Sequence, residues 1–341
     1  MTKNASGIPC LGVRYSFFAA IFGLTLAISS ECVYNVNRKN FGKDGFETMI
    51  LSTQTDVVFR MFGEEEGIRL LAEAGFDAID YSMFPMSADD CHLNTGDVVA
   101  HAKHLRAVAE NYGIRFNQAH APFPCWRAGD DAYNAKMPDR IVRAVMIAGT
   151  LGADSVVVHP IAYPGGGEAQ KEFNINYYRT LEPVALEYGT KIALENMWGH
   201  DNRRGYIVPN VCSFGADLAD YYDTLGNPDA FTVCLDLGHC GLVGEEPDDA
   251  IRALGGKRLG ALHVHDNDYK RDAHVIPYTN GCTMNWDKIT KALGEIDYPG
   301  AFTYEADNFL VRIDRAAIPA ALSYMEKLGR VLIAKIEESR L

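Results

Sequence analysis

The chain has 341 residues, and its 45 acidic against 32 basic residues give a formal net charge of -13. This balance repels phosphate backbones and anionic lipid surfaces, so we expect neither nucleic acid nor a membrane as a main partner. The 48% hydrophobic and 23% charged residues are ordinary for a folded soluble protein and argue against a disordered chain.

The first 48 residues are predicted to be an N-terminal extension of uncertain role. Residues 15–30 form an apolar run preceded by Lys3 and Arg14, which resembles the core of a signal peptide and is too short for a confident membrane span. The eight scattered cysteines contain no CxxC pair and suit a reducing cytoplasm. We therefore predict a cytoplasmic protein whose catalytic domain spans residues 49–341, with an exported form as the alternative.

From Met49 onward, short β-rich runs alternate with longer amphipathic runs, which is the pattern of parallel βα units. The predicted strands are residues 50–53, 78–81, 115–120, 155–159, 191–195, 232–236, 260–265 and 301–305. The predicted helices are residues 64–74, 98–112, 138–151, 176–188, 217–225, 247–254, 286–296 and 316–336. No Gly-rich phosphate-binding turn follows the first strand, so a closed (β/α)8 TIM barrel of the α/β class is preferred over an open doubly wound sheet.

Six residues of metal-ligating types stand at the last position of predicted strands. They are His120, His159, Glu195, Asp236, His265 and Glu305. Because the carboxyl ends of parallel barrel strands all face one mouth, these side chains are expected to converge there. A carboxylate at the end of an apolar run is costly to bury unpaired, and a cation supplies the missing counter-charge. Taken singly, a buried histidine is more often a hydrogen-bonded core residue than a metal ligand.

The seventh predicted strand offers two histidines, His263 and His265, which face the same way because strand side chains alternate with a period of two. We assign His265 to the metal and His263 to a deeper layer, where it hydrogen-bonds a metal-binding carboxylate; the reverse assignment is the alternative. The expected shell of carboxylates and one imidazole favours Mn²⁺, with Mg²⁺, Co²⁺ or Zn²⁺ also compatible. Cys234 and Cys240 flank Asp236 without a zinc motif and are predicted to be packing residues.

Taken together, these motifs resemble the xylose isomerase-like barrel superfamily, which contains sugar-phosphate isomerases and epimerases, ketose 3-epimerases, inosose dehydratases and endonuclease IV. The matching segments read QAHAPF, VVVHP, ALEN, CLDLGH, HVHDNDYKRDAH and TYEAD. The likeness covers roughly residues 49–336 and implies a metal-dependent enzyme acting on a small-molecule sugar or polyol. A homo-oligomer is compatible with the sequence.

Ketose 3-epimerases of this superfamily hold one ion by a Glu, Asp, His, Glu set. Carried over, this set is Glu195, Asp236, His265 and Glu305. The same resemblance implies sugar contacts by His239 and Arg271. Asp201 stands where those enzymes have a substrate-binding glutamate, which leaves its role in doubt. His120 and His159 are expected to contact the substrate or a further ion.

Endonuclease IV enzymes bind three zinc ions with nine ligands, and all nine types are present here. The additional positions are His120, His159, His239, Asp272 and His274. The acidic charge and the lack of an evident basic DNA-contact patch argue against a nuclease. The preferred prediction is a sugar or polyol isomerase or epimerase, and the alternatives are an inosose dehydratase-like lyase and a metal-dependent phosphodiesterase.

The predicted reaction removes a proton from a carbon beside a carbonyl, and a metal stabilises the resulting enediolate. Glu195 and Glu305 are predicted to take and return that proton. Trp198, with Phe123 or Trp126, is expected either to line the mouth as an apolar wall or to pack its rim. The candidates for a phosphate clamp are Arg127, Lys270 and Arg271.

Overall fold

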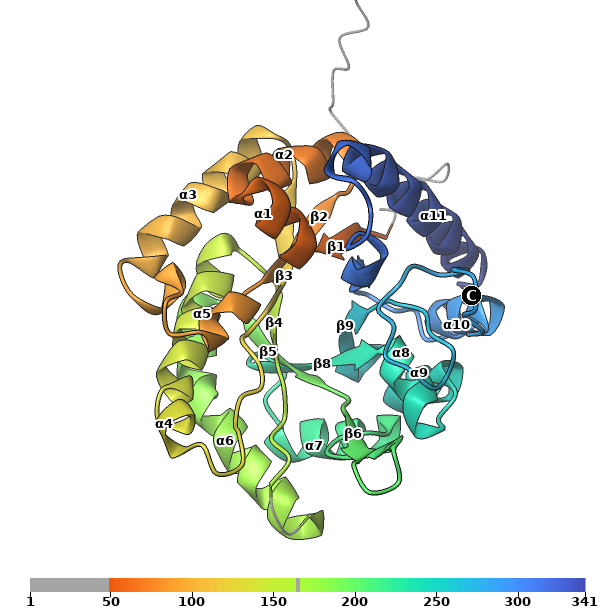
Figure 1. Ribbon diagram of the computed structural model, residues 1–341. Helices are drawn as coiled ribbons and strands as arrows, with labels where there is room; N and C mark the ends of the chain where they lie inside the picture. Colours follow the sequence, from red (N-terminus) through yellow and green to blue (C-terminus); the bar gives the residue numbers. More distant parts are fainter. Residues whose placement is uncertain (1–48, 164–165, 341) are drawn as a thin grey trace, which may run out of the picture. The chain divides into compact units, whose positions relative to one another are not determined.

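The structure is a computed structural model that describes residues 49–163 and 166–340. Eight parallel strands form a barrel, with the sheet order β10-β1-β2-β3-β4-β5-β8-β9, and helices surround it (Figure 1). The ring closes beyond β9, where the Val264 N–H donates to Thr303 O (2.9 Å) and the Glu305 N–H donates to Val264 O (3.1 Å). The predicted (β/α)8 barrel is therefore confirmed, whereas the predicted extension, residues 1–48, lies outside the described residues.

The barrel strands follow the predicted runs closely. They are β1 (Leu51–Gln54), β2 (Ala78–Ser82), β3 (Arg115–His120), β4 (Ser155–Val158), β5 (Lys191–Glu195), β8 (Phe231–Asp236), β9 (Leu259–His263) and β10 (Phe302–Tyr304). His120, Glu195 and Asp236 end their strands as predicted. His159, His265 and Glu305 lie one or two residues beyond the strand ends, a correction to the predicted boundaries. The period-two pattern continues past the last ladder hydrogen bond, and for this reason sequence alone placed these ends too late.

The helices that cover the barrel are α1 (Asp56–Phe62), α2 (Glu64–Ala74), α3 (Val98–Asn111), α4 (Asp131–Asn134), α5 (Met137–Leu151), α6 (Gly167–Tyr188), α7 (Gly215–Leu225), α8 (Leu237–Val243), α9 (Pro247–Arg258), α10 (Trp286–Glu295) and α11 (Ile318–Glu338). Short 3-10 turns are η1 (Phe84–Ser87), η2 (His92–Asn94), η3 (Asp307–Phe309) and η4 (Arg315–Ala317). The predicted helices all occur, and α6 begins nine residues earlier than predicted, after a Gly-rich segment that hides its start. The short helices α1, α4 and α8 were not predicted.

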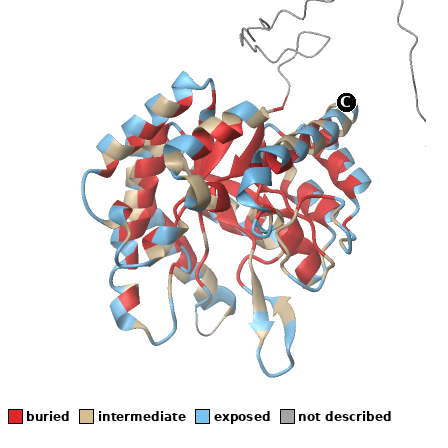
Figure 2. Cartoon of the chain, turned by 45° about the horizontal axis from the view of Figure 1, so that its top comes forward, coloured by how far each residue is buried: buried red, intermediate tan, exposed pale blue. Residues whose placement is uncertain are grey.

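An antiparallel hairpin of β6 (Trp198–Asp201) and β7 (Tyr206–Pro209) follows β5 and was also not predicted. Its residues are exposed or half-buried, and it projects from the barrel in Figure 2. Because it packs little apolar surface, its sequence lacks the alternation that marks a buried strand. The hairpin nevertheless starts directly above β5 and so brings Trp198 to the barrel mouth.

Small apolar side chains fill the barrel interior below the strand ends. Val157, Ala193, Cys234 and Ala261 form an apolar cluster separate from the main core, which lies between the strands and the helices. Two residues after each of these four stands a residue of metal-ligating type, His159, Glu195, Asp236 or His263. Since side chains two apart face the same side of a strand, the interior layer leads directly to the mouth of the barrel.

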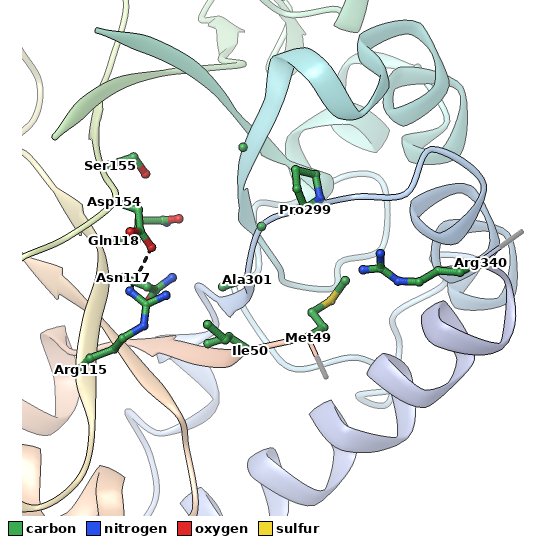
Figure 3. A pocket seen from close by; sticks show the side chains of 12 residues that line it. Met49, Ile50, Arg115, Asn117, Gln118, Asp154, Ser155, Pro299, Ala301 and Arg340 are labelled. Carbon is green, nitrogen blue, oxygen red and sulfur yellow. Dashed lines mark hydrogen bonds and ion pairs between the residues drawn. The ribbon is translucent and has the colours of Figure 1, made fainter. Parts of the chain in front are cut away.

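A cavity of about 270 Å³ opens at the opposite end of the barrel (Figure 3). Residues at or next to strand starts line it, among them Met49, Arg115, Asp154 and Gly300. Arg115 Nη1 donates to Asp154 Oδ2 at 3.0 Å and ties two of these strand starts together. This end of a TIM barrel generally serves stability, so the cavity is distinct from the candidate functional site.

No helix in the described part of the chain is both long enough and apolar enough to traverse a lipid bilayer.

Gly149→Ala tests the packing of α5 against α6. A Cβ at this position would overlap the carbonyl group of Tyr188, at the end of α6. We expect the substitution to destabilise the protein by about 1–3 kcal/mol through overpacking, although alanine by itself favours a helix by about 1 kcal/mol over glycine. Urea unfolding checks the sign, and a stabilised variant would show that the two helices are free to move apart.

Candidate metal centre

The predicted ligand residues converge at the carboxyl ends of the barrel strands. They are His120, His159, Glu195, Asp236, His239, His265, Asp272, His274 and Glu305. Glu195, Asp236 and Glu305 are at most 6% exposed. Burying three carboxylates side by side is unfavourable unless positive charge surrounds them. The centre therefore requires compensation by imidazolium groups or a cation.

The first group of ligand atoms comes from His120, His159 and Glu195. Nε2 of His159 lies 2.8 Å from Glu195 Oε2, and Nε2 of His120 lies 3.6 Å from the same oxygen. The two Nε2 atoms are themselves 3.1 Å apart. Two imidazole nitrogens that aim at one point beside a carboxylate oxygen form an arrangement suited to a shared cation.

The second group comprises Glu195, Asp236, His263 and Glu305, with ligand atoms within 4.8 Å of one another. His263 is fully buried, and its Nδ1 lies 2.7 Å from Glu195 Oε1 and 3.2 Å from Glu305 Oε2. It thus joins the two glutamates, the contact expected for a histidine beneath the metal. The structure groups His263 with the two glutamates, whereas the predicted ligand set has His265 beside them. The ligand set with His265 therefore remains a prediction.

The third group contains Asp236, His239, His265 and His274. Nε2 of His265 lies 2.9 Å from Asp236 Oδ1, and the His265 ring stacks on His274 with centroids 4.0 Å apart. Asp272 joins this group through His274 Nε2 at 3.1 Å. Glu195 belongs to the first and second groups, and Asp236 belongs to the second and third. These two shared carboxylates make the three groups one continuous cluster.

Backbone carbonyls fix the orientation of three of the histidines. Nδ1 of His120 contacts Ala121 O (2.7 Å), Nδ1 of His239 contacts Asn196 O (2.8 Å), and Nδ1 of His274 contacts Glu305 O (3.0 Å). A carbonyl oxygen only accepts hydrogen bonds, so each Nδ1 carries a hydrogen. In a neutral ring this leaves the Nε2 lone pair directed into the cluster, as metal-binding histidines require.

The electrostatics of the centre are dominated by carboxylate and imidazole pairs. Burial by itself would raise the pKa of Asp236, but His239 and His265 outweigh it and hold the pKa at about 2. Burial would lower the pKa of His239, yet Asp236 and Asp272 raise it to about 10. Burial lowers the pKa of His159, so this ring keeps its lone pair at neutral pH. Without a cation, a proton on His239 balances part of the negative charge of Asp236 and Asp272. A bound cation would balance that charge instead.

Buried polar atoms in the centre support the fit to a divalent cation. Glu195 Oε2, Asp272 Oδ1 and His265 Nδ1 are buried without a hydrogen bond of good geometry. Such atoms are rare in native proteins and often mark an ion or water site. Oxygen and imidazole donors without thiolate suit a divalent cation of the Mn²⁺, Mg²⁺, Co²⁺ or Zn²⁺ kind.

Three residues that support the centre were missed in the sequence. Gln54 at the end of β1 donates from Nε2 to Glu305 Oε1 at 2.7 Å. Asp80 in β2 lies 3.6 Å from His263 Nε2. Asn196 accepts the Asp236 backbone N–H at 2.7 Å. Gln54 and Asp80 stand at or near strand ends like the predicted ligands, and this position is the signal that could have revealed them.

The aromatic residues predicted for the mouth lie beside the centre. Trp198 is half-buried and donates from Nε1 to Asp272 Oδ2 at 3.1 Å. The ring of Phe123 is 40% exposed and lies 5.1 Å from the His159 ring. Trp126 is partly buried against the main core. The first two side chains are therefore available to a bound molecule.

The basic residues proposed to contact the substrate lie outside the cluster. The Arg271 side chain is 82% exposed and pairs with Asp268 at 2.7 Å. Lys270 is exposed, and the Arg127 guanidinium stacks on the Tyr133 ring. The structure thus does not bring Arg271 to the ligand residues, and its substrate contact stays a prediction.

Comparisons with known proteins agree with the fold. The model of a family described as xylose isomerase-like TIM barrel matches residues 68–328. Uncharacterized protein y4fM of Sinorhizobium fredii (strain NBRC 101917 / NGR234) is 24% identical over 273 residues, which cover 71% of this chain and 81% of that protein.

Among solved structures, a D-tagatose 3-epimerase-like protein is similar with a TM-score of 0.63 at 19% identity, covering 85% of this chain and 99% of its own. A D-psicose 3-epimerase, solved in the presence of D-fructose, is similar with a TM-score of 0.62 at 18% identity. The match covers 84% of this chain and 99% of the epimerase chain. At these identities the likeness shows the fold.

Gly238→Ala tests whether His265 belongs to the centre. A Cβ at Gly238 would overlap the His265 ring, so the ring must leave its present position. We expect metal affinity to fall about 10- to 100-fold, the loss typical when the support of a ligand is disturbed. Calorimetric titration with Mn²⁺ checks this, with Val243→Ala at the end of the same helix as a control that keeps its affinity. An unchanged affinity in Gly238→Ala would remove His265 from the metal ligands.

Metal affinity should rise with pH. Without a cation, His239 is protonated at any pH below its pKa of about 10. A cation needs the Nε2 lone pair, so binding releases this proton, and affinity should gain about tenfold per pH unit for each proton released. Titrations in buffers of different ionisation enthalpy measure the release. A pH-independent affinity would contradict ligation by His239.

Proposed function

The chain belongs to the xylose isomerase-like TIM barrel family, and on this basis we propose that it is a divalent-metal-dependent isomerase or epimerase of sugars or polyols. The observation that carries the proposal is the pair of buried glutamates, Glu195 and Glu305, held by the same histidine nitrogen at 2.7 Å and 3.2 Å. One carboxylate ends β5 and the other follows β10, two strands that β8 and β9 separate in the ring, so the centre has an acid and a base from different sides. The sugar epimerase names of the structural relatives support a sugar substrate.

We propose that Glu195, Asp236, His265 and Glu305 hold the ion, with Mn²⁺ preferred. When bound, the ion would polarise the substrate carbonyl and stabilise the negative charge that forms on its oxygen. His263 supports the two glutamates from below through its Nδ1. Possible further ligands are His120, His159, His239, Asp272 and His274.

Proton transfer is assigned to the two glutamates. The Oε1 atoms are engaged by His263, 2.7 Å from that of Glu195, and by Gln54, which donates to that of Glu305 at 2.7 Å. The Oε2 atoms face imidazole nitrogens, that of Glu195 at 2.8 Å from His159 Nε2 and that of Glu305 at 3.2 Å from His263 Nδ1. In the proposed reaction the substrate would take the place of these imidazole contacts at Oε2. One glutamate would take the proton from the carbon beside the carbonyl, and the other would return a proton to the neighbouring carbon or the opposite face.

The remaining proposed contacts surround these carboxylates. His120, His159 and His239 present Nε2 toward the centre, and Trp198 would cover one face of the sugar. Arg271 would have to swing in from solvent to reach a substrate. The cysteines of the described residues are all free thiols, which supports the proposed cytoplasmic location.

A metal-dependent phosphodiesterase is the second candidate function. The observation that favours it is the sharing of Glu195 and Asp236 between adjacent ligand groups. Carboxylates that bridge two ions are suited to centres that clamp a phosphodiester. An inosose dehydratase-like lyase would use the same proton removal as the isomerase and differs in the loss of water afterwards.

Hydrogen exchange in D₂O tests the proposed reaction. With Mn²⁺ added, we expect the protein to exchange the α-hydrogen of at least one substrate among ketohexoses, their phosphates and inosose. Glu195→Gln and Glu305→Gln should each lower the exchange rate at least about 100-fold, the lower range of general acid–base catalysis. Glu187→Gln, an exposed glutamate of α6, is the control and should leave the rate unchanged.

The phosphodiesterase alternative predicts the opposite pattern. Hydrolysis of an activated phosphodiester, together with no exchange on any carbonyl compound, would reject the isomerase proposal. Anomalous scattering at the centre counts the ions there, and three zinc ions would strengthen that alternative.

A further inference from the structure

A second set of metal-type side chains lies outside the ring of strands. Glu64 opens α2, His92 lies in η2, and His101 is on α3, and their ligand atoms lie within 4.8 Å of one another. Figure 1 shows α2 and α3 side by side next to β2. We propose that Glu64, His92 and His101, here called the outer site, bind one Zn²⁺ ion per chain. This proposal is independent of the proposed function.

The Glu64 carboxylate is held in place from behind. The Tyr81 hydroxyl donates to its Oε1, and Tyr81 is 2% exposed between Phe59 and Phe116, each at a ring centroid distance of 6.0 Å. Nε2 of His101 lies 3.2 Å from the other oxygen, Oε2. A carboxylate fixed by a buried neighbour with one oxygen turned toward an imidazole matches the arrangement around metal ligands.

Glu64 forms its ion pair with a histidine. Within residues 49–163 and 166–340, its ion pair is with His101, and no lysine or arginine pairs with it. A cation bound at the outer site would meet this carboxylate as a further counter-charge.

His92 completes the set from the solvent side. Its ring is 5.1 Å from the His101 ring at an interplanar angle of 75°, and the residue is exposed. An ion can therefore reach the site without any movement of the barrel. Two imidazoles and one carboxylate, with water in the fourth position, form a recurring tetrahedral zinc shell. Borderline ligands of this kind favour Zn²⁺ over Mg²⁺ or Ca²⁺, which prefer oxygen.

The neighbouring pair Glu65 and His104 provides an internal comparison. Its atoms lie 2.8 Å apart, and the two side chains are 67% and 58% exposed. The pair comes from the same two helices as Glu64 and His101, yet none of the metal-type groups found among the described residues includes it. Glu65 and His104 thus form a simple surface ion pair beside the outer site. The outer site differs from this pair because it has a third residue, His92.

The outer site would stabilise the connection between β2 and α3. This connection also carries Phe84, whose ring packs edge-on against the His120 ring with centroids 4.8 Å apart. An ion bound by His92 ties the same connection to α2 and α3. Binding to the folded chain should therefore raise its thermal stability in proportion to the free zinc present.

Zinc titration of the full-length protein against a chromogenic chelator tests the proposal. We expect His92→Asn to bind one Zn²⁺ fewer per chain than the natural protein, whereas His104→Gln binds the same number. Tyr81→Phe should weaken binding of this ion about tenfold, the loss typical of an outer partner. His92 is exposed, so its replacement leaves the core intact.

Anomalous scattering at the zinc edge locates the ion independently of the titration. A peak between Glu64, His92 and His101 that disappears in His92→Asn would support the outer site. Equal zinc content in the natural protein and His92→Asn, or a zinc-loaded crystal without this peak, would overturn it. Neither result depends on activity, so the test stays separate from the proposed reaction.

Discussion

The negative charge buried at the carboxyl ends of the strands is the constraint on which the rest of the structure depends. Glu195, Asp236 and Glu305 are nearly inaccessible to water, and burying them without positive partners would be prohibitive. Histidines supply the compensation, and those whose pKa is raised, such as His239 and His274, do so by holding protons despite their burial. Protons and a divalent cation would therefore compete for the same nitrogen atoms, which would couple cation binding at the centre to the protonation of its histidines.

The barrel makes this arrangement possible through the period-two alternation of its strands. Inward-facing small side chains such as Ala193 and Cys234 pack in the interior, and the next inward residues are the candidate ligands Glu195 and Asp236. Outward-facing residues of the same strands pack under the helices. Gly238 lets the His265 ring lie against the start of α8, where any side chain would displace it. Packing and chemistry thus share the same strands without competing for the same positions.

The fold could be predicted because its signals are local. Apolar runs of strand length and amphipathic helices are each recognisable within a short window, and together they specify alternating βα units. The position of a residue at a strand end is also local, and it brought His120, Glu195 and Asp236 correctly to one mouth. The hairpin after β5 escaped prediction because its half-exposed strands carry no comparable pattern.

By itself, the sequence determined the barrel and the set of metal-type side chains at its mouth, since both follow from spacing along one chain. Only the tertiary structure decided which atoms meet. Strand register and side-chain rotamers decide three features of the centre that the sequence does not show. These are the pairing of Gln54 with Glu305, the position of His263 between two glutamates, and the exposure of Arg271. The outer site joins three elements whose residues are up to 37 positions apart, as with His101 and Glu64. No local pattern encodes such distances, because they arise when separate elements pack together.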